Sequence, residues 1–380
     1  MTDTYRNPGR RLMTGLVAAA LLWCTPAAAA PETAPPFDET ELMFLGEELY
    51  TVSIASRKAE PLQRAPAAVT IIDAEELKRY RTLSEALRKV PGFFIDRNEL
   101  KERIYLRGIP DSFLVMMDGV PFASDASTQD YPRGMELSLD YIEKIEIIRG
   151  PGSALWGPDA FSGIINLVTR RGESLQGTHL TTETGSYDTR RVGLQTGFAS
   201  RGWDGFLMTA LSKSEGFERD LPGRRSRRDD RFTEVYGRLS YRDVLEISGR
   251  FSRYRDYYSE RSFQLECSER KAFSFLQATF NKSMENAAFS LQGWFQHFDS
   301  LDDYDESRYW QKNRQYGLEV KYDRTFFDNN YATLGASVRY NDGSKTRLKT
   351  LTGKVDYLPA YDTSLISFYF QDKWKILDNL

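Results

Sequence analysis

The chain has 380 residues, which is long for one ordinary domain and suggests two. Its 51 Lys and Arg nearly balance its 54 Asp and Glu, so the net charge of −3 gives no overall attraction to nucleic acid. Only 2 Cys and 2 His are present, which excludes a disulfide framework, a zinc ribbon and a multi-histidine metal centre, whereas 13% aromatic residues favour a β-rich protein.

Residues 1–30 have the order of a secretory signal peptide. Basic residues are followed by an apolar run at 12–23, and small residues at 27–30 predict cleavage near Ala30. The apolar run is shorter than the roughly 20 residues that span a bilayer, so it does not predict a membrane anchor. After cleavage Cys267 is the last remaining cysteine, and an intramolecular disulfide is then impossible.

Residues 31–58 are expected to form a flexible N-terminal segment. The lead-in at 31–38 is acidic and rich in proline. Thr51–Arg57 is a β-prone stretch that follows it. An exposed β-prone stretch behind a flexible lead can add a strand to the sheet of a periplasmic partner.

Residues 59–172 have the pattern of a compact α+β domain. Asp73 and Thr82 each begin a helix with a capping-box pattern, and the second helix carries an apolar stripe. Asp118 and Gly119 predict a hairpin turn, so we read Asp118 as a turn residue and not as a catalytic acid. Strands are expected at 67–72, 93–96, 103–107, 113–117, 143–149 and 164–170.

From residue 173 to 380 the apolar residues recur with a period of two, which predicts about ten strands. The expected strands are 178–184, 191–199, 207–212, 235–241, 245–251, 272–280, 289–298, 316–322, 331–340 and 365–374.

The connections between these strands alternate in length. Short ones are expected at 200–202, 242–244, 282–286 and 327–330, and long polar ones at 213–231, 259–270, 299–315 and 342–362. This alternation is typical of an outer-membrane β-barrel with short periplasmic turns and long outer loops, and a soluble β-sandwich gives no reason for it. Aromatic residues near strand ends suit the membrane interfaces: Trp203, Tyr241, Phe298, Tyr340 and Trp374.

Several motifs of the first half occur in a fixed order along the chain. They are Thr51–Arg57, Pro66–Ile72, Leu83–Gly92, Ile104–Gly108, Leu114–Pro121, Ile142–Gly157 and Ala160–Arg170. With the signal peptide before them and the alternating strands after them, they resemble a TonB-dependent outer-membrane receptor. The resemblance covers the plug domain, over roughly 49–172, and the start of the barrel, and Phe370–Lys375 also looks like a barrel motif of this family.

The resemblance implies active uptake without covalent chemistry, in the outer membrane of a Gram-negative bacterium. No catalytic residue, metal or cofactor is then expected, and the partners would be the C-terminal domain of TonB, lipopolysaccharide and outer-membrane lipid. Arg107 and Arg149 stand where the family has plug–barrel ion pairs. The residues in the position of the TonB box, which couples transport to energy, are Thr51, Val52, Ser53, Ile54 and Ala55.

Two groups of side chains suggest a ligand. The candidates are four of the six arginines in the expected outer loop 213–231 and three tyrosines near the next loop: Arg224, Arg225, Arg227, Arg228, Tyr254, Tyr257 and Tyr258. One hypothesis is that they bind an anionic ferric siderophore through charge and aromatic contacts, and an equal alternative is that they bind lipopolysaccharide phosphates or form a solvated loop. Cobalamin, haem and saccharides remain alternative ligands, although haem ligation by a pair of histidines, His179 and His297, has little support.

Four acidic residues offer oxygen ligands for Ca²⁺, but a solvated acidic loop is the preferred interpretation: Asp299, Asp302, Asp303 and Asp305.

A size comparison limits the architecture. A plug of this length has a radius of about 18 Å, whereas ten tilted strands close to a radius of only about 10 Å. Twenty-two strands give about 22 Å. The sequence therefore predicts a fragment of a transporter or a nonfunctional truncated receptor, with a secreted β-rich binding protein or enzyme as the alternative from another class.

Overall fold

The computed structural model describes most of the plug region and most of the alternating strands. The described residues are 51–54, 60–61, 68–97, 102–122, 131–132, 136–157, 159–216, 218–221, 224–260, 265–304, 307–327, 329–343, 347–350, 355–357 and 361–374. They all belong to one of two compact units, 50–380. The predicted signal peptide, the lead-in and Ala55 lie outside the described residues. No helix of the described ranges is long and apolar enough to cross a membrane.

The first half folds as an α+β domain with short helices and three small sheets. A five-stranded sheet has the order β3-β9-β10-β7-β8 and is accompanied by the sheets β4-β5-β6 and β1-β2. Its elements are β1 Thr51–Val52, β2 Glu60–Pro61, β3 Val69–Asp73, α3 Ala74–Leu77, α4 Leu83–Leu87, β4 Phe93–Arg97, β5 Glu102–Leu106, β6 Ile109–Pro110, β7 Phe113–Met117, β8 Val120–Pro121, β9 Ile142–Ile148, α5 Ser153–Trp156, β10 Gly163–Thr169 and the 3-10 turn η3 Gly172–Ser174.

Both predicted helix starts are confirmed. The Asp73 side chain accepts a hydrogen bond from the Glu76 backbone at 2.9 Å, and the Thr82 side chain accepts one from the Glu85 backbone at 3.2 Å. These bonds satisfy N–H groups that the first helical turn leaves without partners. The predicted apolar stripe of α4 is buried in the core of the plug.

The hairpin turn at Asp118-Gly119 is also confirmed. Met117 pairs with Val120, and both turn residues have positive φ angles, +46° and +79°. Two successive positive φ angles define the turn type that matches strand twist, and aspartate and glycine tolerate this conformation.

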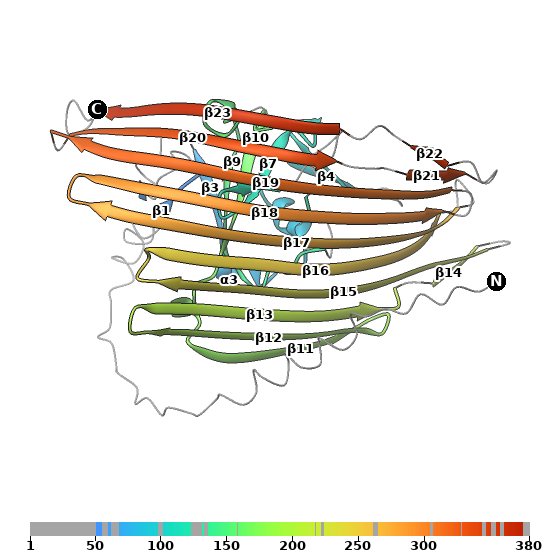
Figure 1. The fold of residues 1–380 in the computed structure, drawn as a ribbon. Coiled ribbons are helices and arrows are strands. Elements are labelled where there is room, and N and C mark those ends of the chain that lie inside the picture. The colour runs from blue at the N-terminus through green and yellow to red at the C-terminus, as the bar shows by residue number, and fades with distance from the viewer. Residues whose placement is uncertain are drawn as a thin grey trace. The chain divides into compact units, whose positions relative to one another are not determined.

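The second half forms one antiparallel sheet that we call the wall. Its ten main strands are joined in the order β11-β12-β13-β15-β16-β17-β18-β19-β20-β23, which confirms the predicted number (Figure 1). They are β11 Gly177–Gly185, β12 Thr189–Ser200, β13 Trp203–Ser214, β15 Arg224–Tyr241, β16 Leu245–Glu260, β17 Leu265–Met284, β18 Ala287–Tyr304, β19 Ser307–Phe326, β20 Asn330–Gly343 and β23 Tyr361–Trp374. Three short strands lie in the long connections between main strands: β14 Glu218–Leu221, β21 Arg347–Thr350 and β22 Val355–Tyr357.

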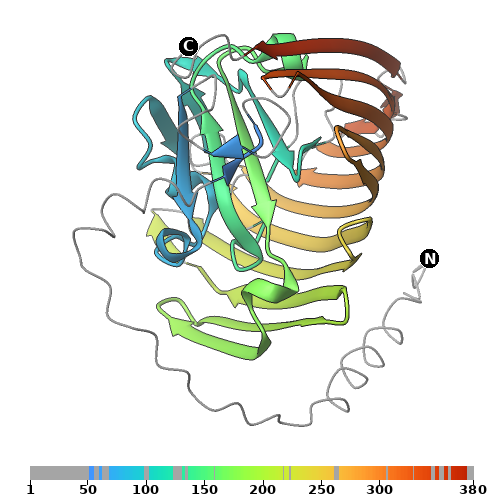
Figure 2. The same cartoon turned by 90° about the vertical axis from the view of Figure 1, so that its left-hand side faces the viewer.

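The wall curves around one side of the plug, with β11 and β23 at its two edges (Figure 2). Four predicted short turns join neighbouring strands at the same end of the wall. By contrast, the connection predicted at 299–315 is too long, whereas the one at 342–362 agrees with the end of β20 at Gly343 and the start of β23 at Tyr361. Strand β18 continues to Tyr304 and β19 resumes at Ser307, so the loop expected at 299–315 is mostly strand. Polar residues on both faces remove the alternating pattern there, whereas the backbone ladder continues.

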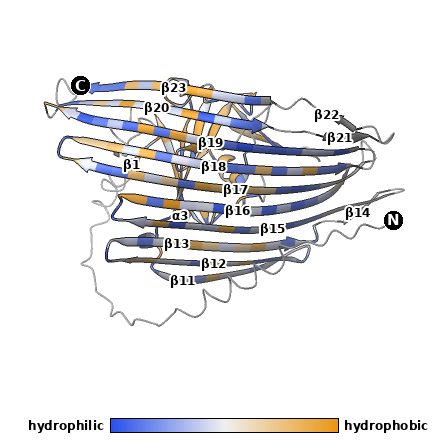
Figure 3. Cartoon of the chain, viewed as in Figure 1, coloured by the Kyte–Doolittle hydropathy of each residue, from blue (hydrophilic) through white to orange (hydrophobic). Residues whose placement is uncertain are grey.

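The polarity of the wall changes along its strands and between its two faces. Hydrophilic residues prevail toward the strand ends near β21 and β22, and hydrophobic residues are more frequent in the other half (Figure 3). The following apolar side chains are on the face turned away from the plug and are 39–80% exposed: Leu207, Leu239, Ile247, Leu276, Leu318, Leu334, Val338, Ile366 and Phe368. An outward apolar band is what a strand needs in order to face lipid.

The prediction of a place at the membrane interface is wrong for Phe298. It is only 7% exposed, because even-numbered residues of β18 face the plug. Trp203 and Trp374 are 45% and 62% exposed, and the Trp203 ring lies 4.7 Å from the Tyr241 ring at a short turn. A position near the end of a strand was therefore not enough to predict an exposed ring. The alternation of side chains between the two faces of the sheet decides where each ring points.

Candidate functional site: the plug–wall interface

One segment of the plug, Glu136–Tyr141, is held by charged side chains of the wall. Glu234 of β15 is fully buried and accepts hydrogen bonds from the Ser138 backbone at 2.8 Å and the Tyr141 hydroxyl at 3.3 Å. Arg250 of β16 pairs with Glu234 at 2.5 Å and donates to the Glu136 backbone carbonyl at 2.6 Å. Each buried charge therefore has a partner, as the low-dielectric interior requires.

Two further wall residues bind the same segment. Lys271 of β17 pairs with the Glu136 carboxylate at 2.8 Å. Arg191 of β12 pairs with Asp140 at 2.5 Å and donates to the Ser138 hydroxyl at 2.8 Å. We call Glu136, Ser138, Asp140 and Tyr141, with their wall partners Arg191, Glu234, Arg250 and Lys271, the clamp.

The hairpin turn of the plug is linked to the wall through Thr169. Asp118 accepts hydrogen bonds from the Thr169 backbone at 2.9 Å and from its hydroxyl at 2.7 Å. The same threonine hydroxyl meets the Tyr236 hydroxyl at 2.7 Å and Arg238 at 2.9 Å. These contacts give the Asp118 carboxylate a structural role, because they connect the hairpin turn to Thr169 and through it to the wall.

Burial controls the ionisation of Tyr141 in the clamp. Its side chain is fully buried and stacks on Tyr236 with a ring distance of 4.4 Å. Desolvation raises the pKa of Tyr141 well above its usual value, although the nearby Arg250 opposes this shift. The hydroxyl is therefore protonated at neutral pH and donates to Glu234.

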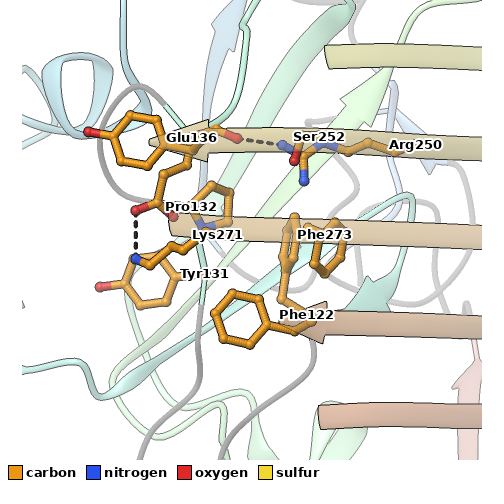
Figure 4. A pocket seen from close by; sticks show the side chains of 10 residues that line it. Phe122, Tyr131, Pro132, Glu136, Arg250, Ser252, Lys271 and Phe273 are labelled. Carbon is orange, nitrogen blue, oxygen red and sulfur yellow. Dashed lines mark hydrogen bonds and ion pairs between the residues drawn. The ribbon is translucent and has the colours of Figure 1, made fainter. Parts of the chain in front are cut away.

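A small cavity lies beside the clamp, where the plug meets β16, β17 and β18 (Figure 4). It has a volume of about 30 Å³, and its lining includes Phe122, Tyr131, Arg250, Tyr254 and Phe273. This volume holds about one water molecule, so it is too small for a ligand.

The segment that resembles a TonB box is folded onto the plug. Thr51 and Val52 form β1, and Val52 and Ile54 are each about 1% exposed. The expectation of an exposed stretch is therefore wrong for these two residues. Their apolar side chains are buried, and Ile54 packs in a cluster with Leu114 and Ile148.

Polar contacts with the plug reinforce this placement of the segment. The buried carboxylate of Glu146 accepts hydrogen bonds from the backbone N–H groups of Ser53 at 3.3 Å and Ile54 at 3.2 Å. Trp156 donates to the Ile54 carbonyl at 2.9 Å, and Lys144 donates to the Thr51 carbonyl. We call Thr51–Ile54 the coupling segment.

Arg107 and Arg149 make their hydrogen bonds inside the plug. Arg107 donates to the Arg149 carbonyl at 2.7 Å, and Arg149 donates to the Pro91 carbonyl at 3.3 Å. Among the residues that the structure describes, neither pairs with a carboxylate of the wall. Their plug–barrel pairing stays a prediction.

The proposed ligand residues lie on two adjacent strands, β15 and β16, with Arg228 opposite Tyr258 in the register. The side chains of the four arginines and of Tyr258 lie outside the described residues. Tyr254 is 8% exposed and lines the small cavity, so it faces the plug. Tyr257 is half-buried on the opposite face of β16.

The acidic residues at 299–303 do not converge on one point. Asp299 pairs with Lys312 at 3.5 Å and Asp303 with Arg308 at 2.6 Å, whereas Asp302 lies on the buried face of β18. Within the described ranges no group of three acidic, histidine or cysteine side chains is arranged to hold a metal ion. His179 and His297 lie on β11 and β18, which are not neighbours in the sheet.

The clamp was missed by sequence reasoning. Glu234 and Arg250 occupy inward positions of strands whose other faces are apolar, and this alternation was available as a signal. The plug partners Glu136 and Asp140 had no comparable signal, because a carboxylate in an irregular segment has no periodicity to give its direction. Pairing across the interface required the three-dimensional arrangement.

The fold and the interface together define a plug-and-barrel architecture, with an α+β domain bound to the inner face of an antiparallel wall. A family model described as the TonB-dependent receptor plug domain matches residues 61–164. Residues 61–164 are thus a plug domain of the TonB-dependent receptor type, and ten strands of antiparallel wall follow it.

Relatives and solved structures agree with this placement. An iron-regulated outer membrane virulence protein of Vibrio cholerae is 36% identical over 128 residues, which cover 32% of this chain and 20% of that protein. The vitamin B12 transporter BtuB of Vibrio vulnificus is 29% identical over 174 residues, which cover 44% of this chain and 28% of that protein. The first of these relatives is an outer membrane protein, and the second is a transporter.

The fold is similar to that of the pyoverdine outer membrane receptor FpvA from Pseudomonas aeruginosa, with a TM-score of 0.70 at 12% identity. That match covers 86% of this chain and 57% of FpvA. The ferric citrate transporter FecA gives a TM-score of 0.58 at 17% identity and covers 82% of this chain and 54% of FecA. The chain thus spans about half the length of these solved structures.

Proposed function

We propose that the protein takes part in the TonB-dependent uptake of a scarce ligand, a ferric siderophore, across the outer membrane. The observation that carries this proposal is the plug: it is bound to the inner face of the wall and holds the coupling segment on its surface. Support for iron comes from the iron-regulated relative and from the structural similarity to receptors of pyoverdine and ferric citrate.

The proposed partner is the C-terminal domain of TonB, which would add Thr51, Val52, Ser53, Ile54 and Ala55 to its sheet. Strand addition uses backbone N–H and C=O groups, and two of these N–H groups are bound by Glu146 in the structure. Engagement therefore requires that the segment leave Glu146. Arg107 and Arg149 are proposed to join the plug to barrel carboxylates.

The partner is tested by binding of the full-length protein to the isolated TonB C-terminal domain. Ile54→Pro removes a backbone donor, and Thr33→Pro in the lead-in is the matched control. We expect binding to be lost in Ile54→Pro and kept in Thr33→Pro. Equal binding of both variants would contradict the assignment of the segment.

The ligand is tested with the combined alanine variant of Arg224, Arg225, Arg227 and Arg228. The control is alanine at Arg201 and Arg242, which lie in short turns at the opposite end of the wall. We expect weaker binding of ferric siderophores only in the first variant, because guanidinium groups there would pair with anionic oxygens. Unchanged affinity would remove these arginines, with Tyr254, Tyr257 and Tyr258, from the ligand site.

Cobalamin is the second candidate ligand. It is favoured by the longer alignment with the vitamin B12 transporter BtuB, 174 residues against 128 for the iron-regulated relative. The same binding assay with cobalamin in place of the siderophore separates the two ligands. Binding of cobalamin without binding of the siderophore would overturn the siderophore assignment and leave the type of plug domain unchanged.

A further inference from the structure

A group of exposed arginines lies on the face of the wall that is turned away from the plug, toward the strand ends near β14. Its members come from three neighbouring strands: Arg231 of β15, Arg253 and Arg255 of β16, and Arg270 of β17. We call them the arginine cluster. The alternation of side chains gives their direction, because Tyr254, between two of them, is buried and lines the small cavity at the plug.

The strand register sets three of these arginines side by side. Arg231 is opposite Arg255, and Arg255 is opposite Arg270. The β-carbons of directly opposed residues in a sheet are only about 4.5–5.5 Å apart, and like charges in such pairs are destabilising. Among the residues that the structure describes, no carboxylate forms an ion pair with a member of the cluster. The row therefore has a charge repulsion that an external anion would remove.

Acidic side chains near the cluster do not balance its charge. Asp299, which is opposite Ala272 on the same face of the wall, pairs with Lys312 at 3.5 Å. Asp229 is two residues from Arg231 on the same face of β15. Even with Asp229 counted, four arginines stand against one aspartate, so the surface keeps a positive charge.

The cluster borders the apolar band of the wall. Phe251 is the neighbour of Arg253 on the same face of β16, and the Arg253 guanidinium lies over the Phe251 ring at 5.3 Å. The band continues with Ile247 of β16 and Leu239 of β15, which are 45% and 43% exposed. Figure 3 shows this change from hydrophilic strand ends to a more hydrophobic half of the wall. A molecule that covers both surfaces therefore needs an anionic head and an apolar tail.

We propose that the arginine cluster binds the phosphate groups of lipopolysaccharide, whose acyl chains lie on the apolar band. Guanidinium groups match phosphate oxygens with two parallel hydrogen bonds, and a phosphate between opposed arginines turns their repulsion into attraction. Three opposed strands span about 10 Å, so the row suits a lipid with more than one phosphate. The inference goes beyond the proposed function, because this lipid is not transported and stays outside the wall.

The first experiment measures lipid binding by the full-length protein in a zwitterionic detergent. The test variant replaces the three opposed arginines of the cluster: Arg231→Gln, Arg255→Gln and Arg270→Gln. The control replaces three arginines at the opposite end of the wall: Arg201→Gln, Arg242→Gln and Arg324→Gln. The probes are purified lipopolysaccharide and the same lipopolysaccharide without its phosphates.

We expect the test variant to bind intact lipopolysaccharide about tenfold more weakly than the control, because it loses charged hydrogen bonds to phosphate. The control should bind it like the unmodified protein, and removal of the phosphates should weaken binding to the unmodified protein by a similar factor. Equal binding of intact lipopolysaccharide by the test variant and the control would overturn the proposal.

A second measurement separates binding from folding. Arg255→Gln removes the central charge of the row, so without lipid we expect an unfolding temperature equal to or above that of the unmodified protein. Adding lipopolysaccharide should raise the unfolding temperature of the unmodified protein, and raise that of Arg255→Gln by less than about half as much. A lower temperature without lipid, with an unchanged shift on adding it, would give Arg255 a purely structural role and overturn the proposal.

Competition experiments distinguish the lipid from soluble anions. Inorganic phosphate alone should not displace lipopolysaccharide, because it has no acyl chain to place on the apolar band. Displacement by inorganic phosphate would show a site for soluble anions and overturn the lipid assignment. Ferric siderophores should bind the test variant normally, and loss of their binding with unchanged lipid binding would also overturn it. Absence of siderophore binding in the unmodified protein would overturn the proposed function and leave the lipid measurements valid.

Discussion

The two sides of the plug meet the wall in different ways. At the clamp, on β12 to β17, buried ion pairs and short hydrogen bonds fix the plug segment Glu136–Tyr141. At a larger cavity beside β15 to β19, which we call the chamber, neutral polar side chains and charged ones line a space of about 360 Å³. The comparison shows how one wall can hold a domain firmly while leaving part of its surface hydrated, because paired buried charges resist separation and a hydrated gap does not.

The largest expected effect is at the centre of the clamp. Glu234→Ala leaves Arg250 buried without its carboxylate, which is expected to cost about 3–5 kcal/mol of plug stability. Thermal unfolding of the full-length protein in detergent, with protease resistance of the plug as the readout, measures the loss. The comparison is Glu234→Leu combined with Arg250→Met, which leaves no unpaired charge and should lose less stability than Glu234→Ala. If Glu234→Ala were as stable as the unmodified protein, the clamp would not anchor the plug.

A smaller effect is expected at the hairpin turn. Asp118→Ala removes the acceptor for two Thr169 groups, at an expected cost of about 1–3 kcal/mol. Asp188 also has a positive φ, +49°, but lies in an exposed turn of the wall, so Asp188→Ala is the matched control. The same unfolding measurement should separate the two variants. Equal losses would mean that the turn conformation matters and the bond to Thr169 does not.

The clamp should also weaken at high pH. Because burial raises the pKa of Tyr141, the folded protein keeps this proton while the unfolded chain releases it above pH about 10. The contribution of Tyr141 to stability is therefore complete below pH 10 and is lost as the pH rises further. Protease resistance between pH 8 and pH 11 should fall less steeply in Tyr141→Phe. An identical pH profile in both proteins would contradict the buried hydroxyl.

The smallest effect is expected in the chamber. Gln292→Ala removes a side chain that borders a hydrated space, so stability should change by less than about 0.5 kcal/mol. Thermal unfolding under the conditions used for Glu234→Ala checks this value. A loss comparable to that of Glu234→Ala would show that both sides of the plug are equally anchored, and the contrast between them would disappear.

Much of the local structure was predictable from the sequence. The caps at Asp73 and Thr82, the turn at Asp118-Gly119 and the ten wall strands all follow from short-range patterns. Strand length was predicted less well. Residues 299–315 continue the ladder after the apolar alternation stops, because backbone pairing does not depend on which face is apolar.

The candidate site was less predictable. The arginines chosen for a ligand were grouped by their closeness in the sequence. By contrast, the pairing of β15 and β16 brings Glu234 and Arg250 together, and both contact the same plug segment. The position of the coupling segment was predicted from the sequence, but its burial was not. Its burial depends on the packing of two apolar side chains and on one buried carboxylate from another part of the plug.

The sequence by itself determined the two periodicities, the turns and the helix caps, because each depends on residues close together in the chain. The tertiary structure alone decided which carboxylates of the plug meet which cations of the wall, and which polar residues border the chamber. It also packed the Trp294 ring over Gly317, where a β-carbon would lie only 2.0 Å from the ring. These contacts join side chains that are far apart in the sequence, and no local sequence pattern specifies which of them meet.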